Sequence, residues 1–290
     1  MLISTTICHR GLVRDQNEDS CISNEQSQLW LIADGVGGNQ GGKVASEMAV
    51  QTIDRRYRQG LPLTEAILEA NRIIVEAGQQ QDLNGMATTV VAAGFSDSRY
   101  QLAWIGDSRA YLITQDSIRQ LSADHNVATA LYQQGEIPEH EVFDHPGQHE
   151  LTRALGLLQV NEVPCLTGTL KGDQCMLLCT DGLSGVLRDQ QILRSYCRHM
   201  PRSQKQLKQL ADDLLQQVLT AGAPDNVCFT LIIPDSASRI ETTETVSAEA
   251  ESGLSAQGKT RSTRRPVNKA PITWLILSIV ILIMLFLFLD

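Results

Sequence analysis

The chain has 290 residues, of which 42% are hydrophobic and 20% charged, a composition typical of a globular protein that excludes wholesale disorder or a fibrous rod. Its formal net charge is −9, and the acidic excess lies in the first 235 residues, which argues against nucleic-acid binding through a basic face. The seven cysteines form no CxxC motif and mostly lie in apolar runs, which predicts buried, reduced thiols rather than disulfides.

In chain order, short apolar runs alternate with turn residues as far as residue 235. Tight turns separate several runs, which favours antiparallel meanders over parallel strands joined by helices. The expected strands are 29–33, 87–95, 100–105, 110–113, 174–180 and 227–233. Three helices are expected after Gly41, after an N-cap at Thr64 and after an N-cap at Ser203. This pattern predicts an α+β fold in which helices pack outside a β-sandwich.

Two segments of different composition follow residue 235. Residues 236–271 are rich in Ser, Thr, Glu and Ala, which predicts a flexible linker. Residues 272–289 carry no charge and no polar stripe, and as a helix they extend about 27 Å, close to the thickness of a bilayer core. Basic residues precede this span, and the N-terminus shows no signal peptide. We therefore expect a single-pass, tail-anchored protein of the inner (cytoplasmic) membrane, with residues 1–235 in the cytoplasm.

Aspartates stand at the ends of several predicted strands, although aspartate weakens strands. They are Asp19, Asp34, Asp107, Asp181 and Asp225. Any one Asp-Gly pair is typical of a turn. Together, the five side chains can converge at one end of the sandwich, where a hard divalent cation relieves their mutual repulsion. Oxygen ligands predict Mg²⁺ or Mn²⁺ rather than zinc.

Two further patterns are weaker. His140, His145 and His149 lack the spacing of a metal-binding pair, so we interpret them as loop-packing residues. Residues 37–43 match the start of a phosphate-binding loop, but Val44 follows where Ser or Thr should hold magnesium. We therefore disfavour a nucleotide-binding ATPase, which nucleotide titration would test. The glycines instead allow a tight backbone turn that lets a carbonyl face a metal.

Nine short motifs occur in an order that resembles the PPM-type (type 2C) metal-dependent protein serine/threonine phosphatases of bacteria. The resemblance extends from about residue 4 to residue 233. Each motif alone is weakly specific, whereas nine in the same order make coincidence implausible. The matching segments are Gly11-x-x-Arg14-x-x-Asn17-Glu18-Asp19, Ala33-Asp34-Gly35-Val36-Gly37-Gly38, Met86-Ala87-Thr88-Thr89, Ile105-Gly106-Asp107-Ser108-Arg109-Ala110-Tyr111-Leu112, Leu121-Ser122-x-Asp124-His125, His145-Pro146, Leu151-Thr152-Arg153-Ala154-Leu155-Gly156, Leu178-Cys179-Thr180-Asp181-Gly182-Leu183 and Asp225-Asn226-Val227.

The resemblance implies a four-layer α-β-β-α sandwich, in which helix pairs flank two antiparallel sheets and two Mn²⁺ or Mg²⁺ ions bind at one edge. By the same resemblance, Asp34 binds both ions, the Gly35 carbonyl binds one, and Asp181 and Asp225 bind the other. Asp107, together with Asp181, serves a third ion seen in bacterial relatives.

Catalytic roles follow from the same resemblance. Arg14 holds the substrate phosphate, Asp19 orients the attacking water, and Glu18 contributes through water. The segment 125–156 matches a mobile flap beside the active site. The sequence departs from the pattern of many eukaryotic relatives at Val36. Those relatives have a histidine at this position, which is proposed as the general acid. The proton donor to the leaving oxygen is therefore unassigned.

The sequence thus predicts a membrane-anchored phosphatase of phosphoserine and phosphothreonine proteins, the substrates of a Ser/Thr protein kinase. Water activated by two divalent cations attacks phosphorus in line, and no cysteine nucleophile is required. The alternative is an inactive phosphoprotein-binding scaffold of the same fold. Loss of a core aspartate would favour the scaffold, and all of them are present.

Overall fold

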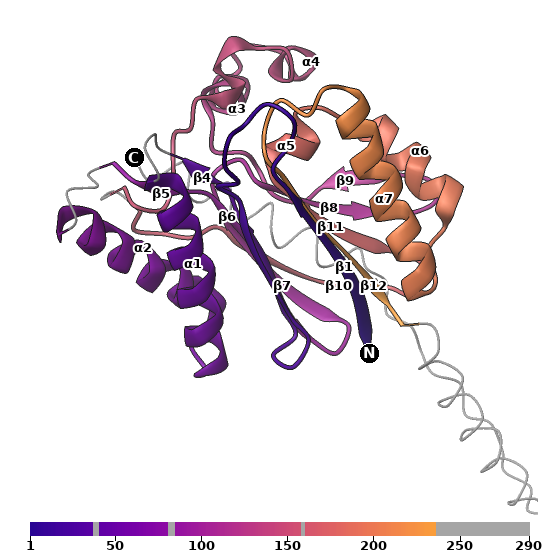
Figure 1. Ribbon diagram of the computed structural model, residues 1–290, viewed down its shortest axis with the longest axis horizontal. Coiled ribbons are helices and arrows are strands. Elements are labelled where there is room, and N and C mark those ends of the chain that lie inside the picture. The colour runs from indigo at the N-terminus through magenta and orange to yellow at the C-terminus, as the bar shows by residue number, and fades with distance from the viewer. Residues whose placement is uncertain (37–40, 81–84, 158–159, 236–290) are drawn as a thin grey trace, which may run out of the picture. The chain divides into compact units, whose positions relative to one another are not determined.

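Two five-stranded antiparallel sheets face each other in the computed structural model, which describes residues 1–36, 41–80, 85–157 and 160–235 (Figure 1). Across the first sheet the strands are β1 (Leu2–His9), β12 (Val227–Pro234), β11 (Cys175–Cys179), β8 (Arg109–Ile113) and β9 (Ile118–Gln120). Across the second sheet they are β10 (Cys165–Thr169), β7 (Arg99–Ile105), β6 (Val90–Ser96), β3 (Leu29–Ala33) and β2 (Ser20–Asn24). A separate short ladder pairs β4 (Gly35–Val36) with β5 (Ala87–Thr88).

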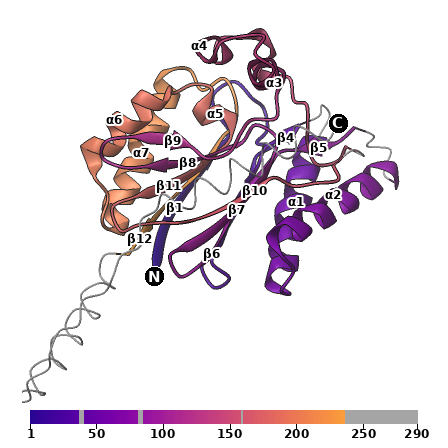
Figure 2. The same cartoon turned by 180° about the vertical axis from the view of Figure 1, so that it is seen from behind.

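A pair of helices covers the outer face of each sheet (Figures 1 and 2). Helices α1 (Gly41–Arg58) and α2 (Leu63–Gln80) pack on the second sheet. Helices α6 (Asp189–His199) and α7 (Gln204–Thr220) pack on the first. The two antiparallel sheets with flanking helices that the sequence predicts are confirmed.

Strand β3 is apolar on both faces because its side chains alternate in direction and each face packs against a different buried layer. Leu29, Leu31 and Ala33 pack toward α1 and α2, whereas Trp30 and Ile32 pack between the two sheets. All five side chains are fully buried, and burial of a large apolar side chain contributes about 1.5–3 kcal/mol. Buried central strands of this kind hold the loops at their ends in fixed positions.

All four edge strands are absent from the sequence prediction. The side chains of β1, β2, β9 and β10 are mostly half-buried or exposed, so these strands show no apolar run. Helix α6 is also missed. The predicted strand 87–95 is divided at Thr89, and Thr64 lies inside the first turn of α2 instead of capping it. The predicted cap at Ser203 is confirmed, because its hydroxyl accepts a hydrogen bond from the Gln206 N–H.

A helical segment between β9 and β10 lies over one end of the sheets (Figure 1). It contains α3 (Val127–Gln133), α4 (Glu139–Val142) and a 3₁₀ helix (Pro146–His149), and it coincides with the segment predicted as a flap. Asn126 caps α3, and its side-chain amide donates to the Gln148 carbonyl at 2.8 Å. These contacts hold the two ends of the segment together.

The seven cysteines all lie in the described part of the chain, and none of them forms a disulfide. The buried ones are Cys175, Cys179 and Cys228, and Cys21 is half-buried. The exposed ones are Cys8, Cys165 and Cys197. The prediction of buried thiols is therefore wrong for the exposed three. Apolar neighbours in the sequence are not enough to bury a cysteine on an edge strand, such as Cys8 or Cys165, or on the outer face of a helix, such as Cys197.

The predicted linker 236–271 and the predicted membrane helix 272–289 lie outside the described residues, as do Gly37 and Gly38 of the second motif. Among the helices that the structure describes, none is both long and apolar enough to cross a bilayer.

Candidate active site

Acidic side chains from four strand ends line one cavity of about 550 Å³. Asp34 follows β3, Asp107 follows β7, Asp181 follows β11 and Asp225 precedes β12. Other predicted site residues on the cavity wall are Arg14, Glu18 and Gly35. The convergence of the strand-end aspartates at one edge of the sandwich, expected from the sequence, is therefore present in the fold.

Lost hydration and mutual repulsion shift the protonation of this cluster. Burial raises the pKa of Asp34 well above its ordinary value, and the charges of Asp19 and Asp181 raise it further. Burial, followed by the charge of Asp181, raises the pKa of Asp107 to about 7. A cluster with such shifts is stabilised by any bound positive charge, whether protons or metal cations.

The donor atoms at the cavity suit hard divalent cations. The predicted ligands offer only oxygen, from four carboxylates and the backbone carbonyl of Gly35. Mg²⁺ and Mn²⁺ prefer such oxygen sets, whereas zinc favours nitrogen and sulfur. The repulsion that raises the pKa of Asp34 is also what a cation relieves. The residues present therefore fit Mg²⁺ or Mn²⁺.

Two threonines hold the backbone of Asp34 in place. The Thr89 hydroxyl accepts a hydrogen bond from the Asp34 N–H at 3.0 Å, and the Thr88 hydroxyl donates to the Asp34 carbonyl at 2.8 Å. The Thr89 hydroxyl also lies 2.7 Å from the Ser108 hydroxyl, next to Asp107. The threonine pair of the third motif thus positions two of the cavity aspartates relative to each other.

Gly35 and Gly42 let helix α1 begin directly against the turn that follows β3. A β-carbon on Gly35 would overlap the Gly42 carbonyl and lie 2.7 Å from the Glu18 carbonyl. A β-carbon on Gly42 would lie 2.7 Å from the Gly35 carbonyl oxygen and 2.9 Å from Glu18 Oε2. A side chain at either position therefore forces α1 away from the cavity wall, which explains these glycines without a nucleotide.

Lys43 does not take part in the cavity. Its ammonium lies 3.6 Å from Glu47 Oε1 one turn along α1, and it is not among the residues that line the cavity. A phosphate-binding loop requires this lysine at the phosphates. The geometry of Lys43 therefore gives the ATPase alternative no support.

Asn226 ties the N-terminal loop to the start of β12. Its side-chain carbonyl accepts from the Glu18 N–H at 2.8 Å, and its amide donates to the carbonyls of Arg10 and Gln16 at 2.8 and 2.9 Å. Its own N–H donates to the Asp225 carboxylate at 2.8 Å. One buried side chain therefore fixes the loop that carries Glu18 beside the last of the cavity aspartates.

Asp19 lies behind the cavity wall and is only 7% exposed. The Thr180 hydroxyl donates a hydrogen bond of 2.9 Å to the Asp19 carboxylate. The same hydroxyl accepts a hydrogen bond of 3.0 Å from the Cys228 N–H. Burial raises the pKa of Asp19 well above its ordinary value, while the Thr180 hydrogen bond lowers it. Thr180 precedes Asp181, so this hydroxyl connects the buried carboxylate with the cavity.

Arg14 extends over the cavity from the loop after β1. Its guanidinium donates to the Asp225 carboxylate at 2.7 Å, a contact that raises the pKa of the arginine. Its side chain is 55% exposed. A planar, permanently charged fork at the mouth of the cavity is suited to phosphoryl oxygens.

His149 is a cavity residue that the sequence pattern does not reveal. Its Nδ1 lies 3.4 Å from Asp181 Oδ2, and this carboxylate raises the pKa of the imidazole. The loop-packing prediction is therefore wrong for His149. It is confirmed for His145, whose ring accepts from the Gly147 N–H at 3.0 Å. No sequence spacing links His149 to Asp181, because only the fold of the flap segment brings them together.

Arg109 and Asp124, from the fourth and fifth motifs, form a buried ion pair. Arg109 donates three hydrogen bonds of 2.7–3.1 Å to the Asp124 carboxylate and one of 3.0 Å to the Tyr111 hydroxyl. Gln120 donates a further hydrogen bond to Asp124 at 2.7 Å. Removing one partner of such a pair typically costs about 3–5 kcal/mol, because the other charge remains buried. These motif residues therefore support the fold below the cavity.

Comparison with known proteins decides the family. The model of the family described as Protein phosphatase 2C matches residues 9–221, a range that contains every motif before the last. The chain belongs to the protein phosphatase 2C family. It is accordingly a protein serine/threonine phosphatase.

Similar proteins of this family come from bacteria. The chain is 33% identical over 237 residues to the serine/threonine phosphatase stp of Listeria innocua, covering 77% of this chain and 92% of the relative. A crystal structure of the Mycobacterium tuberculosis serine/threonine phosphatase PstP/Ppp superposes with a TM-score of 0.72 at 30% identity, covering 81% of this chain and 99% of that one. A structure of the PstP catalytic domain in complex with two manganese ions gives a TM-score of 0.69, also at 30% identity, and covers 80% and 97% of the two chains.

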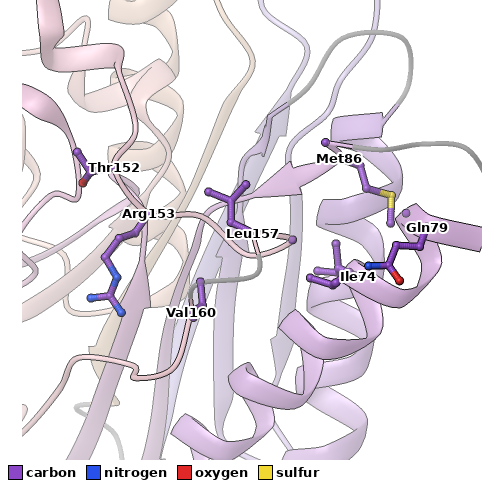
Figure 3. A pocket seen from close by; sticks show the side chains of 11 residues that line it. Ile74, Gln79, Met86, Thr152, Arg153, Leu157 and Val160 are labelled. Atoms are coloured by element: carbon purple, nitrogen blue, oxygen red, sulfur yellow. The ribbon is translucent and has the colours of Figure 1, made fainter.

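This protein phosphatase 2C chain also has a larger cavity, of about 680 Å³, which none of the predicted site residues lines (Figure 3). It lies between α2 and the segment that follows the 3₁₀ helix. Ile74 and Met86 form one side, and Leu157 and Val160 lie opposite them (Figure 3). The residues that line it in the described part of the chain are mostly apolar and include no carboxylate, so they lack the groups that hydrolysis requires.

Proposed function

We propose that this chain hydrolyses phosphoserine and phosphothreonine in proteins, using two Mn²⁺ or Mg²⁺ ions at the acidic cavity, with a third possible beside Asp107. The observation that carries this proposal is the convergence of Asp34, Asp181, Asp225 and Arg14 on one cavity. The two manganese ions in the related PstP catalytic domain support the metal assignment. The substrates proposed are phosphoproteins made by a Ser/Thr protein kinase.

Five residues would hold the cations. Asp34, the Gly35 carbonyl, Asp181 and Asp225 would hold two of them, and Asp107 with Asp181 would hold the third. When bound, the cations neutralise phosphoryl oxygens and lower the pKa of the water that attacks phosphorus. Phosphoryl transfer demands positioning and charge neutralisation more than covalent chemistry, so the cavity needs no protein nucleophile.

The remaining polar residues position the reactants. Arg14 binds the phosphoryl oxygens with its guanidinium, which requires it to share or release its contact with Asp225. Asp19, held by the Thr180 hydroxyl, orients the attacking water. Glu18, whose backbone N–H donates to Asn226, contributes through water at the cavity wall.

The test is hydrolysis of a phosphothreonine peptide by the full-length protein in detergent. Activity should require added Mn²⁺ or Mg²⁺ and should disappear on exhaustive chelation. Asp34→Asn should lower kcat at least about a hundredfold, because a neutral amide is a weaker ligand for a hard cation. The matched control is Asp116→Asn, at an exposed turn outside the cavity. Full activity after chelation would refute the metal mechanism, and tight peptide binding without hydrolysis would favour the scaffold.

We also propose that residues 272–289 anchor the enzyme in the cytoplasmic membrane, with residues 236–271 as a flexible linker. The support is the run of uncharged residues, together with the basic residues Lys259, Arg261, Arg264, Arg265 and Lys269 that precede it. Fractionation tests this proposal. The full-length protein should remain in membranes after a carbonate wash, and a chain ending at Pro234 should be released; recovery of the full-length protein in the wash would refute it.

A further inference from the structure

Three cysteine sulfurs meet near the acidic cavity. In the described ranges, Cys8, Cys21 and Cys228 are the one group of three or more potential metal-binding side chains whose donor atoms all lie within 4.8 Å of one another. Four other cysteines stand apart from this group. The cluster has no role in the proposed hydrolysis.

The fold explains how residues so far apart in sequence come together. Cys8 on β1 and Cys228 on β12 are register partners in the first sheet. Cys21 lies on β2 of the second sheet and packs against the apolar layer between the sheets, where Cys228 is buried. Cys228 is fully buried, Cys21 is half-buried and Cys8 is exposed. The sulfurs therefore join the two sheets and open to solvent on the Cys8 side.

The three sulfurs lie close enough to share protons, and this proximity shifts the pKa values of Cys8 and Cys21 in opposite directions. Hydrogen bonds from Cys228 and Cys8 lower the pKa of Cys21 to about 4. The contact with Cys21 raises the pKa of Cys8 to about 11, while the Asn17 amide donates to the Cys8 sulfur at 3.3 Å. Three thiols at this separation form an arrangement in which a cation can replace protons on the sulfurs.

We propose that Cys8, Cys21 and Cys228 bind one soft cation of the Zn²⁺ or Cu⁺ class through their sulfurs. Thiolates select these cations, whereas Mg²⁺ and Mn²⁺ favour the oxygen-lined cavity. A Zn–S bond of about 2.3 Å places tetrahedral sulfurs about 3.8 Å apart, within the 4.8 Å limit of the cluster. The exposed side at Cys8 leaves room for a fourth, exogenous ligand.

This thiol site lies directly behind the residue that orients the attacking water. Cys8 Sγ lies 3.9 Å from the Asp19 carbonyl, and the Cys228 N–H donates to the Thr180 hydroxyl that holds the Asp19 carboxylate. The backbone carbonyl of Asp19 therefore faces the thiol cluster, while its carboxylate is held by Thr180, the residue before Asp181. The thiolates would give the sulfur site its preference for soft cations.

The experiment is a Cd²⁺ titration of the full-length protein in detergent. The protein is first reduced and stripped of metal with a chelator, and excess Mn²⁺ is then added so that the oxygen ligands are saturated. Cd²⁺ is the probe because its bonds to thiolates give an ultraviolet charge-transfer band. We expect saturation at one equivalent, and loss of the band when Zn²⁺ or Cu⁺ is added; the cation that displaces Cd²⁺ at lower concentration is the preferred ligand.

Variants identify the ligands. Cys8→Ser and Cys21→Ser should each weaken Cd²⁺ binding at least about tenfold, while Cys165→Ser and Cys197→Ser, at exposed lone thiols, should leave it unchanged. Cys228 is avoided because it is fully buried, and circular dichroism checks that each variant is folded. The proposal is overturned if the wild-type protein gives no band, or if the Cys21→Ser variant binds Cd²⁺ as tightly as wild type. It is also overturned if neither Zn²⁺ nor Cu⁺ displaces Cd²⁺. A disulfide between Cys8 and Cys228 that mass spectrometry still finds after reduction would overturn it as well.

Discussion

The guanidinium of Arg14 donates a hydrogen bond of 2.7 Å to the carboxylate of Asp225, so the residue proposed to bind phosphate contacts a residue proposed to bind metal. The two lie 211 positions apart in the chain. Both side chains are partly exposed, at 55% and 35%, so the pair contributes little to stability. Under the proposed roles, substrate phosphate would compete with Asp225 for Arg14, and a cation would compete with Arg14 for Asp225.

Arg14→Ala should raise the KM for a phosphopeptide at least about tenfold while Mn²⁺ activation is retained. A charged bidentate donor to phosphate is lost, whereas the Asp225 carboxylate gains freedom to bind the cation. Steady-state kinetics at several Mn²⁺ concentrations measure both effects. The control is Arg10→Ala, which removes an exposed arginine whose guanidinium donates to the Asp15 carbonyl. Loss of Mn²⁺ activation with an unchanged KM would show that Arg14 is not the phosphate-binding residue.

Lys43→Ala should change kcat and KM by less than about twofold, because the lysine pairs with Glu47 on the surface of α1. Exposed pairs one helical turn apart contribute only about 0.3–0.5 kcal/mol. Phosphopeptide kinetics and ATP binding by calorimetry are the measurements. ATP binding that disappears in Lys43→Ala would restore the phosphate-binding loop rejected above.

Thr180→Val should lower kcat with little change in KM, because the Asp19 carboxylate loses its hydroxyl donor and the Cys228 N–H loses its acceptor. Leaving buried polar groups unpaired costs about 1–3 kcal/mol of stability. Thr180→Ser retains the hydroxyl and should restore most of kcat. Equal losses in the valine and serine variants would mean that the methyl packing of Thr180, and not its hydroxyl, matters.

His125→Gln should make the protein less sensitive to acid. His125 accepts a hydrogen bond from the Gly106 N–H at 3.0 Å, and burial lowers its pKa to about 4. An unfolded histidine takes up its proton near pH 6.5, so between pH 6.5 and 4 the unfolded state binds more protons and stability falls as the pH falls. Wild type should therefore lose up to about 2 kcal/mol more than the variant between pH 7 and 5.

Urea unfolding of the full-length protein in detergent at pH 7 and 5 measures this difference. The control is His140→Gln, because the His140 side chain is 81% exposed. Identical pH dependence in wild type and His125→Gln would contradict the assignment of a neutral, buried imidazole.

A chain ending at Pro234 should keep the kcat and KM of the full-length enzyme on a soluble phosphopeptide. β12 ends at Pro234, and every residue of the acidic cavity lies before it. Tethering raises the local concentration of membrane-bound substrates without changing turnover. A truncated enzyme that is folded but inactive would mean that the C-terminal segment takes part in controlling the site.

The sequence allowed the central strands and the five aspartates to be predicted, because a strand buried on both faces is a continuous apolar run and its end is marked by a polar turn. Asp34 after β3 and Asp181 after β11 are examples. The edge strands could not be predicted in this way, since half of each faces solvent. His149 and the Cys8–Cys21–Cys228 cluster depend on which distant segments pair, and no local pattern records that.

The pairing of β1 with β12 also has a consequence for synthesis on the ribosome. Leu2 is the partner of Pro234 and His9 is the partner of Val227, and Asn226 orders the loop that carries Glu18. A nascent chain that has emerged only as far as α7 therefore has no partner for its first strand and no closed catalytic edge. We therefore expect a translation product that stops before residue 226 to lack phosphatase activity, because it cannot close this edge.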